Sequence, residues 1–183
     1  LLDVKGRLSF IGANLAGQLV LNGANVKSQE GHSLSLYQAK ISGGVWMKPV
    51  GDRTFSATGS VNMGDAEVGS ISAQGAIIDS GSNERPAVIA DSIKSEGNVD
   101  FSRADIRGGI SLLHASTPLL WLSEATLHGE FALNAGGLAA GLVRMKLLNA
   151  KGKVSFIGAS ITRQLILDGA HISTSGDFAL STY

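Results

Sequence analysis

One short pattern of apolar and small residues recurs along nearly the whole chain. Two apolar residues flank a single residue, two spacers follow, and then come a small residue, one more spacer and another apolar residue. Residues 8–15 form a clear copy, and residues 154–161 repeat it almost letter for letter. Apolar residues at positions i and i+2 have the period of a β-strand and not that of a helix. The sequence therefore predicts an all-β protein assembled from short repeated strands.

The spacing of the copies indicates how these strands are arranged. Strands of three or four residues cannot bury an apolar face alone, so they must stack on copies of themselves. In the first half of the chain the strand starts are separated alternately by 10–11 and 15–16 residues, which suggests two strands per coil. We therefore expect a right-handed parallel β-helix, a solenoid of about seven two-strand coils. Only a turn near residues 138–142 leaves room for helix.

The repeat also bears on domain organisation. It continues from residue 1 to residue 183 without a change of composition, which predicts a single β-helix domain. The chain starts without methionine and the repeat begins almost at once, so we expect a fragment of a longer repeat protein.

Three stretches lengthen the coils of the first half, namely residues 27–33, 48–58 and 79–85. They fall on what the spacing treats as the same connection, so we expect three loops stacked on one edge of the rod. Loops on one face of a solenoid often carry its binding surface. The candidate interaction residues in these loops are Glu30, His32, Asp52, Arg53, Glu84 and Arg85.

The middle residue of each strand should point outward, and these residues form two different columns. One is small and mostly polar: Ser9, Ser35, Asn62, Val88, Ser111, Ala132 and Ser155. The other column is Val20, Trp46, Ser72, Asp100, Trp121, Lys146 and Ile166. Both tryptophans thus fall on one exposed face, and exposed aromatic side chains mark contact surfaces. Trp46 and Trp121 complete the candidate interaction surface.

Asp91 does not fit the pattern. Aligning Ile93 with Ile41 places Asp91 in the inward position that Ala39 holds, and an unpaired buried carboxylate would be costly. Either Asp91 accepts hydrogen bonds from turn amides, or the register slips by one residue and Ser92 takes the inward position. We favour the slip.

Composition narrows the chemistry further. Fifteen basic and fifteen acidic residues cancel, so no overall field favours nucleic acid or an anionic membrane. Without cysteine there is no disulfide or thiolate ligand. The four histidines lack metal-ligand spacing. Glu96, Asp100 and Asp105 lie around one strand, but the outward Asp100 has no acidic partner one coil away, where Ser72 and Trp121 fall. The sequence predicts no catalytic residue, cofactor or metal.

Two stretches carry a resemblance to known proteins. Residues 11–24 read IGANLAGQLVLNGA and residues 30–36 read EGHSLSL. In these, the chain resembles a family of bacterial repeat proteins of unknown function, some of them labelled membrane-associated oxidoreductase. Through residues 104–108, ADIRG, it is also similar to pentapeptide-repeat proteins. The resemblance implies a β-helix over nearly the full length. No dinucleotide-binding glycine turn, redox cysteine pair or membrane segment accompanies it here.

Together these features predict a non-catalytic scaffold or protein-interaction module. Its partner would be a protein, either a second copy or another chain, with no nucleic acid and no membrane insertion. The alternative is a carbohydrate-binding or carbohydrate-active β-helix protein. The sequence shows no signal peptide or transmembrane segment, so we slightly favour a cytoplasmic location.

Overall fold

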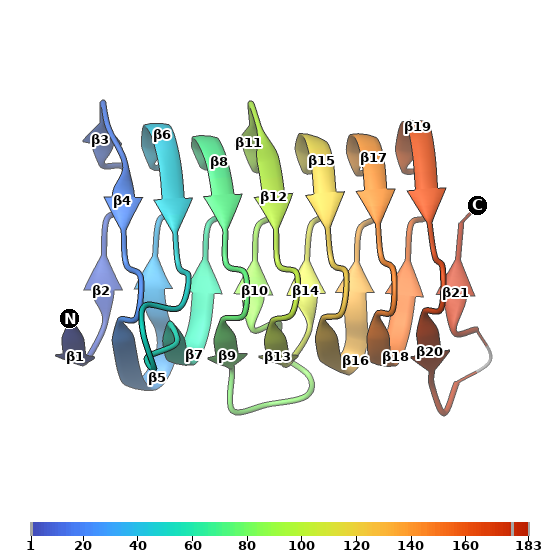
Figure 1. Cartoon of the computed structure of the whole chain (residues 1–183), viewed down its shortest axis with the longest axis horizontal. Coiled ribbons are helices and arrows are strands. Elements are labelled where there is room, and N and C mark those ends of the chain that lie inside the picture. Colours follow the sequence, from blue (N-terminus) through green and yellow to red (C-terminus); the bar gives the residue numbers. More distant parts are fainter. Residues whose placement is uncertain (1, 177, 183) are drawn as a thin grey trace.

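A computed structural model describes residues 2–176 and 178–182. Within these residues the chain forms only β-strands, turns and bends, and the strands stack into a rod with the two termini at opposite ends (Figure 1). All pairings between named strands are parallel and join one turn to the next. The predicted all-β parallel solenoid is confirmed.

Each turn of the rod has four sides, and several strands bend across a corner to serve two of them. The first and second sides form one sheet, made of β1 (Asp3–Lys5), β2 (Leu8–Ser9), β5 (Asn25–Ser35), β7 (Ser56–Asn62), β9 (Ile77–Asp79), β10 (Val88–Ile89), β13 (Asp105–Arg107), β14 (Ile110–Ser111), β16 (Thr126–Asn134), β18 (Asn149–Ser155), β20 (His171–Ser173) and β21 (Leu180–Ser181). The third and fourth sides form the other sheet, made of β3 (Asn14–Leu15), β4 (Leu19–Val20), β6 (Lys40–Trp46), β8 (Glu67–Ser72), β11 (Lys94–Ser95), β12 (Asn98–Asp100), β15 (Ser116–Trp121), β17 (Ala139–Arg144) and β19 (Ser160–Ile166).

The turns begin on the first side, at β1, β5, β7, β9, β13, β16, β18 and β20, so the described chain makes about eight turns, the last of them partial. In Figure 1 the chain rises along the far side and descends along the near side as it advances from the N-terminus, which makes the solenoid right-handed. Seven two-strand coils were predicted. The sequence pattern reveals only the second and fourth sides, because these carry two apolar residues each. Residues 138–142 lie mainly in β17 and contain no helix.

The recurring pattern corresponds to half a turn, running from the second side to the third or from the fourth side to the first. The corner within each copy is a tight turn. Gly12, for example, has φ of 63°, and the amide of the following Ala13 donates to the Phe10 carbonyl at 3.0 Å. Gln38 takes the same left-handed conformation one turn later, at φ 57°. The small residue that follows faces the core, as Ala39 does.

The corner between the first and second sides varies regularly in length from turn to turn. In turns one, three, five and seven, two residues separate the last paired residue of the first side from the first paired residue of the second side. In turns two, four, six and eight, the number of separating residues is six, eight, four and six, respectively. Insertions therefore occur in every second turn. The loop of turn four reaches across turn five to turn six. There the Glu130 amide donates to the Asn83 carbonyl of the loop at 2.9 Å.

The core is one continuous column of apolar side chains inside the rod. One such row along the rod contains Phe10, Leu36, Met63, Ala90, Leu112, Ala135 and Phe156. Alanine fills most of the inward corner positions, which lets the sides approach closely. This packing fixes which residues point outward, and so determines the surface on which any site is built.

Candidate functional site

The fourth side carries both tryptophans in one straight row. Its outward positions, paired from turn to turn, are Val20, Trp46, Ser72, Asp100, Trp121, Arg144 and Ile166. We call this row the fourth-side ladder. The prediction that Trp46 and Trp121 share a face is confirmed, with two turns between theirs. The prediction for Lys146 is wrong, because Arg144 holds the ladder position and Lys146 lies two residues later, at the corner.

The two tryptophans are half-buried where they lie. The Trp46 indole lies so close to Gly44 that a Cβ on that glycine would stand 2.8 Å from its Cε2. The ammonium of Lys48 is 4.7 Å from the ring centroid of Trp46, a cation–π contact. Between the tryptophans, Ser72 and Asp100 are only 8% and 9% exposed. The aromatic rings of this face are thus separated by recessed polar groups.

The predicted column of small outward residues lies on the second side, with two corrections. Val88 and Ala132 are buried, and the outward positions belong to Ile89 and Asn134. Both errors follow insertions at the corner before the second side, which displace the strand by one or two residues from where the spacing places it.

The slip favoured at Asp91 is also wrong. Lys94 pairs with Glu67, so Ile93 and not Ser92 holds the inward position of Ala39. Asp91 stands at the turn, where its Oδ1 accepts hydrogen bonds from Ser111 Oγ at 2.5 Å and from the Leu113 amide at 3.0 Å. The alternative of a carboxylate bonded to a turn amide describes it better, although Asp91 does not point inward.

The candidate loops separate onto two corners. His32 lies within β5, and Glu84 and Arg85 lie in the loop before β10; both segments occupy the corner between the first and second sides. Asp52 and Arg53 lie between β6 and β7, at the corner between the fourth and first sides. The expectation of three loops on one edge is therefore wrong for residues 48–58. The backbone of Glu30 belongs to β5, but its side chain lies outside the described part of the chain.

Nearby arginine side chains contribute to lowering the pKa of two groups, the Asp3 carboxyl and the His32 imidazole. Arg53 Nη2 donates to Asp3 Oδ1 at 2.7 Å, and this hydrogen bond lowers the pKa of the Asp3 carboxyl. Burial lowers the pKa of His32, and the charges of Arg7 and Arg85 lower it further. The ring of His32 lies 3.4 Å from Asn62, measured from Nε2 to Nδ2, while its Nδ1 is buried without a partner among the described residues.

Acid should therefore weaken the fold through His32. The folded-state pKa lies below the ordinary value of about 6.5, so the unfolded chain binds more protons as the pH falls past that value, and stability is lost there. We expect the free energy of unfolding from urea titrations to fall between pH 7.5 and pH 5, and to fall less in His32→Gln. An equal loss in both proteins would show that His32 contributes nothing to acid sensitivity.

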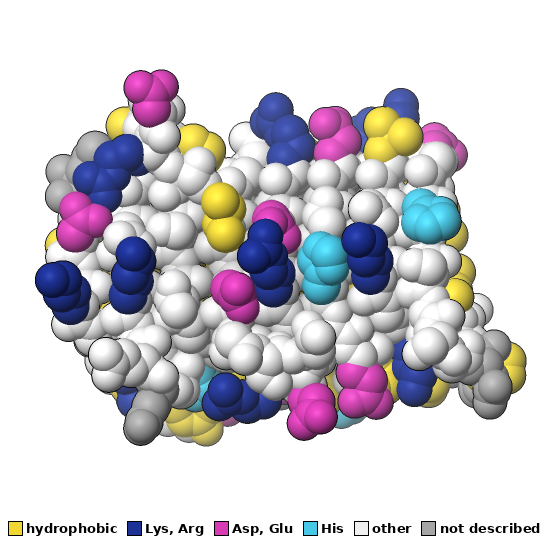
Figure 2. Space-filling view, turned by 90° about the horizontal axis from the view of Figure 1, so that it is seen from below, with side chains coloured by type: hydrophobic (Ala, Val, Ile, Leu, Met, Phe, Trp, Pro, Cys, Tyr) yellow, Lys and Arg dark blue, Asp and Glu magenta, His cyan; other side chains and the backbone are white. Residues whose placement is uncertain are grey.

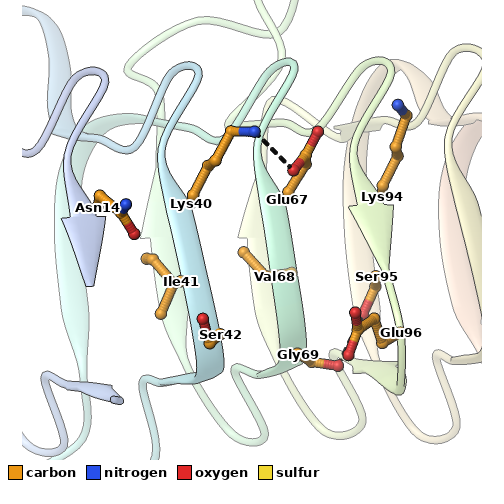
Figure 3. A pocket seen from close by; sticks show the side chains of 10 residues that line it. All are labelled: Asn14, Lys40, Ile41, Ser42, Glu67, Val68, Gly69, Lys94, Ser95 and Glu96. Carbon is orange, nitrogen blue, oxygen red and sulfur yellow. Dashed lines mark hydrogen bonds and ion pairs between the residues drawn. The ribbon is translucent and has the colours of Figure 1, made fainter. Parts of the chain in front are cut away.

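The third side carries a shallow groove that the sequence did not reveal (Figure 3). Its volume is about 500 Å³. Lys40, Glu67 and Lys94 stand at the same register position in successive turns, and Lys40 Nζ is 3.1 Å from Glu67 Oε2. Each follows the inward residue of the tight turn between the second and third sides, which is the sequence signal for this row. Alternating charges on an exposed strand face favour a solvated surface or a polar contact.

The first side carries a longer row of charged and polar side chains. Its members are Lys5, Lys27, Thr58, Asp79, Arg107, His128, Lys151 and Ser173. Figure 2, which views the rod from this side, shows charged groups of both signs arranged along it. Arg107 contacts Asp105 at 3.0 Å and Asp79 at 4.0 Å. The mixed signs make this a solvated face rather than a track for a polyanion.

The carboxylates considered for catalysis do not converge. Glu96 lies at the corner between the third and fourth sides, Asp100 on the fourth side, and Asp105 on the first. Within residues 2–176 and 178–182, no three His, Asp or Glu side chains gather as they would around a metal ion. The described chain likewise has no helix that is long and apolar enough to cross a bilayer.

Comparison with protein-family models, with curated proteins and with solved structures finds no match to this chain.

Proposed function

We propose that this chain is a non-catalytic solenoid scaffold that associates with a second copy of itself through its fourth side. The observation that supports this most strongly is the fourth-side ladder, which places both tryptophans, Val20 and Ile166 along one face. Tryptophan is the residue type most enriched among the residues that dominate interface energies. The first side, by contrast, presents charges of both signs.

The order of residues in the ladder allows the face to pack on itself. A two-fold axis between turns three and four, parallel to the strands, sets Trp46 of each copy opposite Trp121 of the other. It also sets Ser72 opposite Asp100, so that each recessed carboxylate faces a neutral side chain of the other copy. Shifting the register by one turn would set Asp100 opposite itself, and like charges facing each other are destabilising. An isologous pair of this kind closes without further growth.

The size of the face predicts a weak, concentration-dependent dimer. The axis pairs six of the seven strands and leaves Ile166 outside the overlap, so at a spacing of about 4.8 Å the overlap is about 24 Å long. Its width is one short strand, so the buried area lies at the small end of specific interfaces. The association should therefore appear in the micromolar range, where dilution reverses it.

Light scattering over a concentration series would test the proposal. We expect the mass of the wild-type protein to rise from monomer to dimer with concentration, and the double variant Trp46→Ser/Trp121→Ser to remain monomeric. The matched control is Tyr37→Ser, which removes an aromatic side chain that is 37% exposed at the corner between the second and third sides. It should dimerise like the wild type. A wild type that stays monomeric throughout, or a double variant that still dimerises, would overturn the proposal.

A further inference from the structure

The second side of the rod carries a row of small polar side chains along its whole described length. Seven of its eight outward positions are serine or asparagine; in order they are Ser9, Ser35, Asn62, Ile89, Ser111, Asn134, Ser155 and Ser181. We call this row the second-side ladder. Strand pairing spaces its members by about 4.8 Å. A fixed repeat of hydroxyl and amide groups therefore runs parallel to the rod.

This ladder forms the floor of a groove. Ser35 is fully buried and Ser111 and Ser155 are 5% and 6% exposed, although all three occupy outward positions. Larger side chains stand on both edges of the row. Ile157 is 48% exposed on the edge toward the third side, and Phe131 is 39% exposed on the edge toward the first. The small residues are thus recessed between larger ones.

Two cavities occupy the groove in the later turns. One, of about 260 Å³, lies over Ser155 and Ser181 between Phe131, Ile157 and Phe178. The other, of about 80 Å³, lies over Ser111 and Asn134 and shares Phe131 with the first. The ladder is therefore accessible over at least four consecutive turns, with aromatic rings at its edge.

Several polar groups of this floor lack partners. Ser35 Oγ is buried without a hydrogen bond among the described residues. Ser155, which is only 6% exposed and lines the larger cavity, also has no side-chain hydrogen bond among the described residues. A buried hydroxyl that forms no hydrogen bond loses the solvation it had in water. The Ser155 hydroxyl faces the larger cavity, so a polar ligand bound there would supply its missing partner.

We propose that the second-side groove binds an uncharged, linear polysaccharide lying along the rod. Serine and asparagine both donate and accept hydrogen bonds, which matches the hydroxyl groups at the edge of a sugar ring. The aromatic rings of Phe131 and Phe178 suit the apolar C–H face of the same sugar, although the Lys153 ammonium already lies 5.3 Å from the ring centroid of Phe131. No member of the ladder is charged, and the charges beside it are of both signs, with Lys153 lining one cavity and Glu84 and Glu130 the other. The spacing of the ladder is close to the length of one pyranose in an extended chain.

An extended peptide fits this surface less well. Peptides that add to a sheet bind mainly through unpaired backbone groups at a sheet edge. The backbone groups of the second side are already used between turns, as in the pairing of Val88 with Val61 and Ile110. The groove therefore offers side chains and not a sheet edge, which favours a ligand recognised through its hydroxyl groups.

The test is calorimetric titration of the full chain with cellohexaose, laminarihexaose and chitohexaose, and with the corresponding disaccharides. At least one hexasaccharide should bind, and its disaccharide should bind at least tenfold more weakly because it spans fewer ladder members. Ser155→Ala, which removes the hydroxyl without adding volume, should weaken binding at least tenfold, as should Phe131→Ala. Asn134→Ala provides a third variant if either of these fails to fold, as judged by circular dichroism.

The matched control is Trp46→Ser/Trp121→Ser, which changes the fourth side and should bind the sugar like the wild type. This control also separates the groove from the fourth-side interface, so that either proposal can fail alone. The groove proposal would be overturned if no hexasaccharide bound at millimolar concentration. It would equally be overturned by binding that Ser155→Ala and Phe131→Ala leave intact, or by binding of an extended peptide and none of the sugars.

Discussion

Leu36→Asp should abolish folding. Leu36 is fully buried, and the inward row places Phe10 one turn before it and Met63 one turn after. The substitution loses the transfer energy of a leucine, about 2–5 kcal/mol, and adds the larger cost of an unpaired carboxylate without water. Domains have about 5–15 kcal/mol of total stability, so little or none would remain. Circular dichroism and the yield of soluble protein would show the loss.

Asn14→Asp is the matched control for that substitution. It introduces the same charge one turn away, at an exposed outward position paired with Lys40. We expect its melting temperature to stay close to that of the wild type. If Leu36→Asp folded as well as Asn14→Asp, the inward phase assigned to the second side would be wrong.

Gly69→Ala should also destabilise the fold strongly, although it adds only a methyl group. Gly69 lies at the corner between the third and fourth sides, where turns stack backbone on backbone. A Cβ there would overlap the Gly43 carbonyl oxygen and lie 2.6 Å from that of Ser42. Both carbonyls belong to the backbone between paired residues of β6 and β8, Ile41 with Val68 and Gly44 with Ser70, so relieving the overlap requires the backbone to shift. Overpacking of this kind costs about 1–3 kcal/mol, so we expect the melting temperature to fall by about 3–10 °C.

Gly17→Ala tests the effect of a methyl group at the same corner in the first described turn, where a Cβ has no backbone of a neighbouring turn against it. A Cβ on Gly17 would meet nothing within 4 Å, and its backbone is not left-handed. Replacing a glycine in such a conformation stabilises a protein by about 0.4–1 kcal/mol, because the unfolded chain loses freedom. Thermal melts should therefore move in opposite directions for the two variants. Equal falls would show that backbone stacking does not limit this corner.

The sequence predicted the solenoid but only half of each turn. The second and fourth sides are visible because two apolar residues flank one outward residue there, as in Leu34-Ser35-Leu36. The first and third sides point only one apolar residue inward each, such as Val26 or Ile41. A single apolar residue has no period, so these sides look like loop in the sequence.

The candidate site was predicted unevenly for a related reason. The prediction placed Trp46 and Trp121 on one face correctly. The segment from the fourth side to the first has the same length in every turn except the one with residues 48–58, so the pattern is easy to follow there. Errors at Val88 and Ala132 follow insertions after which two adjacent buried residues fit the pattern equally well. The groove of the second side depends on how far neighbouring side chains project from the surface. The pattern of apolar and polar residues along the sequence does not specify this.

The alternation of insertions along one corner limits how this protein can grow. Neighbouring turns are only about 4.8 Å apart, whereas a loop that leaves the rod and returns is wider than one strand. The odd turns therefore leave room for the loops of the even turns: a Cβ on Gly59 would stand 2.9 Å from the Gly31 carbonyl oxygen, and one on Gly108 would stand 2.5 Å from that of Arg85. Duplicating a turn that carries a loop would place two loops side by side, whereas duplicating it together with a loop-free neighbour preserves the alternation. The smallest block that adds a further loop without conflict is therefore two turns long.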